Sequence, residues 1–109
     1  MEVVLLKHAR EDRDYWIKTG NKRIMKRITE LLKDIEKHPF SGIGKPEPLK
    51  GENGKWSRRI TDEHRMIYSV SSGCIYIFVF RNWRNGMFRL IVSQRISYFP
   101  LPWKMMPMV

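Results

Sequence analysis

The chain has 109 residues, of which 42% are hydrophobic, and it carries a formal net charge of +10 at pH 7. This length is that of one domain with its own core, and the hydrophobic content excludes an intrinsically disordered chain. The positive charge favours a polyanionic partner: a nucleic acid, an acidic protein or an anionic membrane surface.

The cysteine and histidine content excludes several kinds of site. The single cysteine, Cys74, rules out an internal disulfide and fits a reducing cytosol. Three histidines and one cysteine, without the spacing of metal ligands, argue against zinc, so we expect no metal and no cofactor. No segment has the form of a signal peptide or the length of a membrane span, which predicts a cytoplasmic protein without a membrane partner.

The first 37 residues predict a strand followed by a helical hairpin. The β-branched and leucine-rich run at 2–7 is typical of a strand. A helix is expected over 8–20, with Gly20 as its stop, and Asn21 caps a second helix that reaches about Lys37. Apolar residues recur at helical spacing along this second helix: Ile24, Met25, Ile28, Leu31, Leu32 and Ile35.

The middle of the chain predicts a stiff loop and then three strands. Residues 39–54 are rich in glycine and proline, and Pro46 and Pro48 hold the backbone around Glu47 extended. The strands are expected at 55–60, 64–70 and 74–81, joined by short turns at 61–63 and 71–73. Alternation puts Ser57 and Arg59 on one face of the first of these strands, with Trp56, Arg58 and Ile60 on the other.

These elements predict an α+β domain over residues 1–81, in the order β-α-α-β-β-β. We expect an antiparallel sheet with the helical hairpin packed on one face. Residues 82–109 form an extension in which 87–93 could add a strand. The apolar end of this extension, 97–109, lacks periodicity and is read either as a mobile tail or as an arm that packs on a partner.

One carboxylate, Glu47, stands among many cations. All eleven acidic residues precede residue 64, whereas six Lys and Arg follow it. The residues near Glu47 in sequence that can bind an anion are Lys45, Lys50, Arg58, Arg59 and Arg65. This pattern favours chemistry on the phosphate of RNA, because RNA carries its own 2′-OH nucleophile and needs only a base, an acid and cations.

Three segments of the chain closely resemble the YoeB toxins of the RelE superfamily. They are 44–50 (Gly-Lys-Pro-Glu-Pro-Leu-Lys), 56–60 (Trp-Ser-Arg-Arg-Ile) and 63–68 (Glu-His-Arg-Met-Ile-Tyr). The resemblance covers about residues 1–81. It implies a small ribonuclease-like α+β fold with two helices on an antiparallel sheet. It also implies the toxin of a bacterial toxin–antitoxin pair, which enters the ribosome, cuts messenger RNA, forms homodimers and binds a YefM-like antitoxin with an acidic tail.

Carried onto this chain, the resemblance implies a metal-independent endoribonuclease with Glu47 as general base and Arg65 as the group that stabilises the phosphorane. Lys45, Lys50, Arg58, Arg59 and Arg81 would contact the RNA. The family ends in an arginine, an aromatic residue, a histidine and a terminal tyrosine, whereas this chain has Arg81, Asn82, Trp83 and Arg84 and then continues. Trp83 therefore replaces the family's general acid, which implies a weakened nuclease.

Several simpler interpretations compete with these roles. Glu47 could pair with a neighbouring lysine, Arg58 and Arg59 could protect an exposed strand edge, and Arg65 could pair with Asp62 or Glu63. For the whole protein, the alternatives are a catalytically inactive module that binds the ribosome or the antitoxin, and a gyrase inhibitor of the ParE kind.

Overall fold

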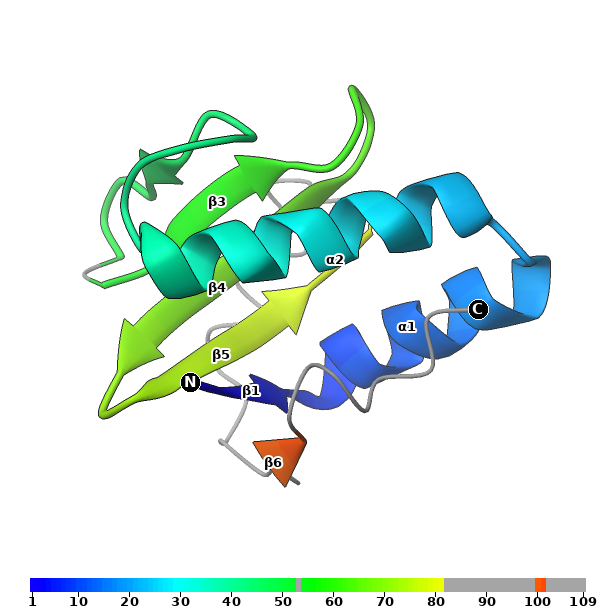
Figure 1. Cartoon of the computed structure of the whole chain (residues 1–109), viewed down its shortest axis with the longest axis horizontal. Helices are drawn as coiled ribbons and strands as arrows, with labels where there is room; N and C mark the ends of the chain where they lie inside the picture. Colours follow the sequence, from blue (N-terminus) through cyan, green and yellow to red (C-terminus); the bar gives the residue numbers. More distant parts are fainter. Residues whose placement is uncertain (53, 82–99, 102–109) are drawn as a thin grey trace.

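The structure, a computed structural model, describes residues 1–52, 54–81 and 100–101. Within these ranges a strand is followed by two helices and then by further strands (Figure 1). The elements are β1 (Glu2–Leu5), α1 (Lys7–Thr19), α2 (Lys22–Lys37), β2 (Glu47–Pro48), β3 (Trp56–Arg59), β4 (Arg65–Ser71), β5 (Cys74–Val79) and β6 (Pro100–Leu101). The expected α+β class and the order of the main elements are confirmed.

The strands form one sheet in the order β2-β3-β4-β5-β1-β6. Neighbours from β2 to β5 are antiparallel, which confirms the prediction for β3, β4 and β5. In contrast, β1 runs parallel to β5, so the sheet is mixed. A parallel pair needs a long connection between its strands. Here the two helices and strands β2, β3 and β4 form this connection between β1 and β5. The composition of residues 2–7 does not indicate the direction in which β1 runs.

Two strands were not predicted. The loop before β3 contributes β2, because Glu47 and Pro48 pair with Ser57 and Trp56. Pro100 and Leu101 form β6 on the free side of β1. The strand expected at 87–93, and most of the extension, lie outside the described residues.

Both helices form where the sequence indicated. Gly20 ends α1 in the left-handed conformation, with φ of 67°, and its N–H donates to the carbonyl of Ile17. The side chain of Asn21 accepts a hydrogen bond of 3.2 Å from the N–H of Ile24 and so caps α2. No helix among the described residues is long and apolar enough to cross a membrane.

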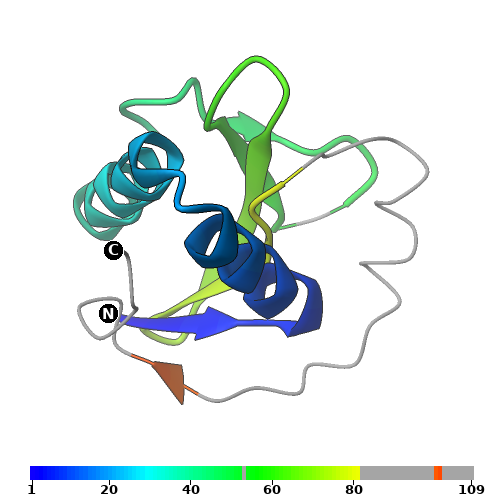
Figure 2. The ribbon, with the colours of Figure 1, turned by 90° about the vertical axis from the view of Figure 1, so that its right-hand side faces the viewer.

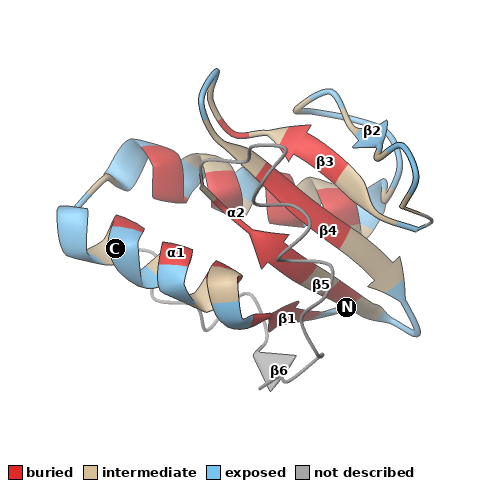
Figure 3. Ribbon diagram, turned by 180° about the vertical axis from the view of Figure 1, so that it is seen from behind, coloured by how far each residue is buried: buried red, intermediate tan, exposed pale blue. Residues whose placement is uncertain are grey.

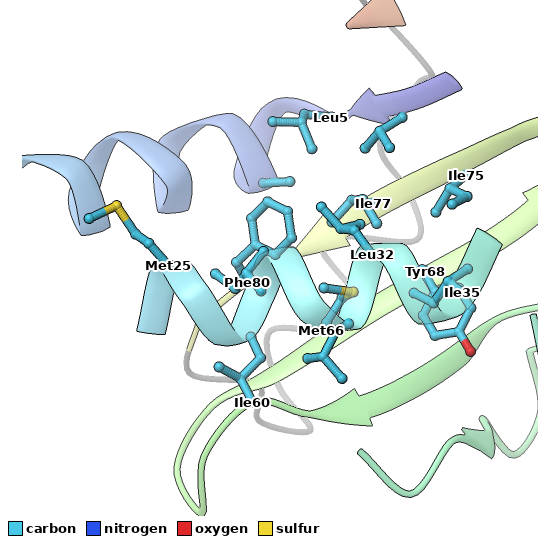
Figure 4. Packing of buried hydrophobic residues seen from close by; sticks show 14 of the residues in the cluster. Leu5, Met25, Leu32, Ile35, Ile60, Met66, Tyr68, Ile75, Ile77 and Phe80 are labelled. Atoms are coloured by element: carbon cyan, nitrogen blue, oxygen red, sulfur yellow. The ribbon is translucent and has the colours of Figure 1, made fainter. Parts of the chain in front are cut away.

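The main core lies between the helices and one face of the sheet (Figures 1 and 2). All six apolar residues of the α2 stripe are buried, as their spacing predicted. They pack with side chains from α1, β1, β4, β5 and the residue after β5 (Figure 4), which include Leu5, Met66, Tyr68, Ile75, Ile77 and Phe80. Met66 and Tyr68 thus face the helices, whereas Ile67 between them faces the other way.

Figure 3 shows the sheet from the side away from α2. A smaller apolar cluster lies on this face and consists of Val4, Leu6, Ile67, Phe78 and Val79. Leu49 packs against this cluster from the loop that carries Glu47. This face of the sheet carries the candidate site.

We expect Leu32→Ala to lower the free energy of unfolding by about 2–5 kcal/mol, because a buried leucine is replaced by a cavity in the main core. Urea unfolding measures this change. The control is Lys26→Ala, at an exposed position of the same helix, and its free energy of unfolding should stay within about 0.5 kcal/mol of the parent's. Equal effects of the two substitutions would contradict the burial described for α2.

Candidate active site

Strand register places Glu47 on the same face as two arginines. Glu47 lies directly opposite Ser57, and Arg59 lies directly opposite Arg65. Directly opposed residues project from the same face, and so do residues two positions apart on one strand. Glu47, Ser57, Arg59 and Arg65 therefore share the face of the sheet that lies away from the helices.

Ser57 connects the carboxylate to the arginine. Nη1 of Arg65 donates a hydrogen bond of 3.0 Å to Oγ of Ser57. Ser57 is only 3% exposed. The Arg65 guanidinium thus crosses to β3 and reaches the residue that pairs with Glu47. Directly opposed Cβ atoms lie about 5 Å apart, so Glu47 and the Arg65 guanidinium flank the same serine. Sequence analysis placed Ser57 on this face but gave it no role.

The two opposed arginines create an excess of positive charge on this face. Like charges directly opposite one another in a sheet are unfavourable unless an anion lies between them. Arg59 has one acidic neighbour, with Nη1 3.8 Å from Oδ1 of Asp62, but the Asp62 side chain is 97% exposed. Arg65 donates to Ser57 and makes no ion pair with Asp62 or Glu63 in the described residues. The pair is suited to binding an anionic group.

Glu47 itself is exposed, as are the two lysines near it in sequence, Lys45 and Lys50. Within the described part of the chain, the ion pairs do not include Glu47. Lys45 has an unusual backbone for a residue with a side chain, with φ of 49°. The carboxylate is therefore presented to solvent between two cations rather than being neutralised by them.

Arg58 does not belong to this face, and its predicted contact with RNA does not fit the structure. The residue is 0% exposed, and it lies on the helix side of β3. All five of its N–H groups are used. They donate to Oη of Tyr68, Oδ2 of Asp34 and the carbonyls of His38, Ser41 and Ile43. The alternative of an exposed edge residue is excluded for Arg58 by the same burial.

These contacts attach the loop before β2 to the sheet and to α2. Tyr68 adds a further bond, because its Oη donates to the carbonyl of Pro39 at 2.7 Å. Asp34 also accepts from the N–H of Ile43 at 3.1 Å. Burial of the Asp34 carboxyl opposes its ionisation, but the bonds from Arg58 and Ile43 outweigh this and hold its pKa below the ordinary value.

Comparison with known proteins places the chain in a family. The family model for YoeB-like toxins of bacterial type II toxin–antitoxin systems matches residues 6–83. The chain belongs to the YoeB-like toxin family. It is 47% identical over 78 residues to Toxin YoeB of Escherichia coli K12, covering 71% of this chain and 92% of that protein.

Solved structures agree with the assignment. The YoeB/ParE toxin from Agrobacterium tumefaciens superposes with a TM-score of 0.72 at 40% identity, over 77% of this chain and 100% of that one. A heterotetrameric YoeB–YefM complex from Staphylococcus aureus gives a TM-score of 0.65 at 39% identity, over 75% of this chain and 94% of the matched chain. The YoeB-like fold thus accounts for the elements that carry Glu47, Arg59 and Arg65.

His64 has a packing role in this YoeB-like domain. Its ring meets Trp16 edge to face, with centroids 4.9 Å apart, and burial lowers the pKa of the imidazole. The neutral form is therefore favoured near pH 7, which is unsuited to a positioned acid. Trp83, which the resemblance aligns with a histidine of the family, lies outside the described residues.

Arg81 engages α1. Its Nε lies 3.4 Å from Oδ1 of Asp12, and its guanidinium carbon lies 3.9 Å from the centroid of the Tyr15 ring. The described contacts of Arg81 therefore lie on α1, whereas those of Arg65 lie on β3. This arrangement gives no support to the predicted RNA contact of Arg81.

Asp12 and Trp16 hold the chain where β5 ends, which sequence analysis missed. Oδ2 of Asp12 accepts a 3.0 Å bond from the N–H of Phe80, and Nε1 of Trp16 donates a 3.2 Å bond to the Phe80 carbonyl. Burial raises the pKa of Asp12 to about 6, although the bond from Phe80 and the charge of Arg81 oppose this.

The titration of Asp12 should make stability depend on pH. Because folding raises this pKa from 3.8 to about 6, the folded chain binds the proton more tightly. The stabilisation is complete below about pH 4 and is lost as the pH rises through about 6. Each pKa unit corresponds to about 1.4 kcal/mol. Relative to Asp12→Asn, the parent should therefore lose about 3 kcal/mol of unfolding free energy between roughly pH 4 and pH 8.

Urea unfolding of both proteins across this range measures the difference. The asparagine variant keeps His8, Glu11 and Arg81, the charged groups near Asp12, so the comparison isolates the contribution of the Asp12 carboxyl. A constant difference between the two proteins, or one that grows in favour of the parent at higher pH, would contradict the assignment.

Proposed function

We propose that this chain is the toxin of a type II toxin–antitoxin pair and that it cuts messenger RNA on the ribosome. The observation that carries the proposal is the placement of Glu47 and the Arg65 guanidinium on either side of Ser57, on one face of the sheet. Membership of the YoeB-like family, the opposed pair of arginines and the net charge of +10 support the same conclusion.

In the proposed reaction, the Glu47 carboxylate takes the proton from a ribose 2′-OH. The 2′ oxygen then forms a bond to the adjacent phosphorus, and the bond from phosphorus to the 5′ oxygen breaks. The products are a 2′,3′-cyclic phosphate and a free 5′-OH. Arg65, with Arg59 opposite it, stabilises the negative charge of the phosphorane, and Lys45 and Lys50 hold neighbouring phosphates.

The leaving 5′ oxygen also needs a proton. The chain has Trp83 where the family has its histidine, and an indole N–H cannot supply that proton. In our proposal water protonates the leaving group. Because positioned acid catalysis contributes about 10²–10⁴-fold, we expect a slower nuclease than a family member that keeps the histidine.

The proposed partner is a YefM-like antitoxin with an acidic segment. The matched Staphylococcus aureus structure is a complex of YoeB with YefM. Arg59 and Arg65 would attract a carboxylate-rich segment as they attract phosphate, which would block the site. We also propose a cytoplasmic location and a homodimer, in keeping with the family resemblance.

The test of the chemistry uses the full chain on ribosomes that translate a defined message. Glu47→Gln keeps the size of the side chain but removes the base, so we expect cleavage to fall by about 10²-fold or more. Glu63→Gln is the matched control, because Glu63 is another exposed carboxylate, on the turn next to Arg65. Primer extension on the recovered message measures both rates.

Equal cleavage by the parent and Glu47→Gln would contradict the role of Glu47. If the message stays intact with the parent while the ribosome is still bound and growth still slows, the chain is the inactive module considered above. In that case the loss of the family's histidine has abolished the chemistry.

Partner binding has a separate prediction. Expression of the chain should slow growth, and co-expression of a YefM-like antitoxin should restore it. The double variant Arg59→Glu, Arg65→Glu should bind this antitoxin at least about 10-fold more weakly, because each substitution replaces an attractive charge by a repulsive one. Isothermal titration measures the affinity, and unchanged binding would contradict docking of the antitoxin at this site.

A further inference from the structure

The loop that leads into Glu47 has little secondary structure of its own. Between the end of α2 and the start of β2, it is held largely by side chains. The carbonyls of His38, Ser41 and Ile43 accept bonds from Arg58, and that of Pro39 accepts one from Tyr68. Buried backbone groups must find partners, and Arg58 alone provides the hydrogen-bond donor for three of these four carbonyls.

The fit between this loop and its support is close. At Gly42 a Cβ would lie 2.0 Å from Oδ2 of Asp34, and at Gly44 it would lie 2.7 Å from a methyl carbon of Leu31. Both glycines have positive φ, of 107° and 79°. The loop therefore lies directly against α2, with Asp34 between the loop and the Arg58 guanidinium.

The position of Gly44 is transmitted to Glu47 over a short distance. The carbonyl of Gly44 accepts a 2.7 Å bond from the N–H of Arg59, and only Lys45 and Pro46 separate Gly44 from Glu47. Proline fixes its own φ and restricts the residue before it. Displacement of the loop at Gly44 would consequently shift Glu47 relative to Ser57 and Arg65.

We propose that Arg58, together with Asp34, is a positioning residue that sets the place of Glu47 relative to Ser57 and Arg65. The guanidinium touches neither RNA nor the reacting atoms, and it acts by holding the loop from His38 to Gly44. This inference rests on the proposed function, because the catalytic role of Glu47 is part of that proposal. Lysine cannot replace Arg58, since its three donors cannot occupy five acceptors in this planar arrangement.

The test uses Asp34→Asn, which removes the charge that faces Arg58 but keeps the size of the side chain. A second variant, Tyr68→Phe, removes only the hydroxyl that joins Arg58 to Pro39. The control is Val3→Ala, a fully buried substitution on β1, three strands away from β3 in the sheet. Thermal melts select a measuring temperature at which every variant is folded.

The first readout does not depend on activity. Hydrogen exchange of the Arg59 amide reports on its bond to Gly44. We expect exchange at least about 10-fold faster than in the parent for both loop variants. In Val3→Ala, this amide should exchange no faster than the loss of global stability requires. Exchange at the parent rate, or acceleration equal to that of the control, would overturn the proposed support of the loop.

The second readout separates positioning from folding and binding. In single-turnover cleavage on ribosomes, Asp34→Asn should lower the maximal rate constant about 10–100-fold, because small misplacement of a reacting group is costly. The ribosome concentration for half-maximal rate should change less than about twofold, and Val3→Ala should cleave like the parent. A changed half-maximal concentration with an unchanged maximal rate would contradict a positioning role.

Failure of this inference can be told apart from failure of the proposed function. If Glu47→Gln cleaves like the parent, the catalytic role of Glu47 is wrong, whatever the loop variants do. If Glu47→Gln is impaired but the loop variants exchange and cleave like Val3→Ala, the chemistry stands and the positioning role of Arg58 is wrong.

Discussion

The structure depends on the burial of one guanidinium between a helix and a sheet. Taking an arginine out of water is unfavourable unless its charge is balanced and its donors are satisfied. Arg58 meets both conditions, with Asp34 as the counter-ion and with Tyr68 and three loop carbonyls as the other acceptors. The same contacts give the loop a defined path where glycine and proline provide no regular hydrogen bonding.

This constraint explains why adjacent arginines have different tasks. Arg58 and Arg59 are neighbours on β3, so their side chains project from opposite faces of the sheet. Arg58 is closed in by α2 and the loop, whereas Arg59 and Arg65 remain on the side that also carries Glu47. One strand thus supplies both the anchor of the loop and part of the surface for an anion.

Sequence patterns were sufficient for the helices and most of the sheet because those elements follow local rules. The spacing of Ile24, Ile28, Leu31 and Ile35, with Asn21 and Gly20 at the boundary, defines the hairpin, and alternation correctly placed Ser57 with Arg59. The direction of β1 and the pairing of β2 depend on contacts between distant residues. No local pattern specifies those contacts.

The site was harder to infer for a related reason. An arginine in a strand is usually exposed, and only the positions of Asp34 and the loop carbonyls show that Arg58 is enclosed. In the sequence, Asp12 resembles the other charged residues of α1, which are expected to face water. Only its burial and the bond that it accepts from the N–H of Phe80 distinguish it from them. The charge pattern indicated Glu47 and the cations near it, the family resemblance implied the catalytic roles of Glu47 and Arg65, and strand register places both residues on one face.

The hydrogen bonds between α1 and Phe80 bear on which changes of sequence leave the fold intact. Side chains near the beginning of the chain satisfy both backbone groups of Phe80, through Asp12 and Trp16. The chain at the end of β5 is therefore fixed by residues of α1 that lie 64 and 68 positions earlier in the sequence. Substitutions after residue 81 leave the groups that make these two bonds unchanged, so the contact that ties the end of β5 to α1 does not depend on the identity of the residues that follow.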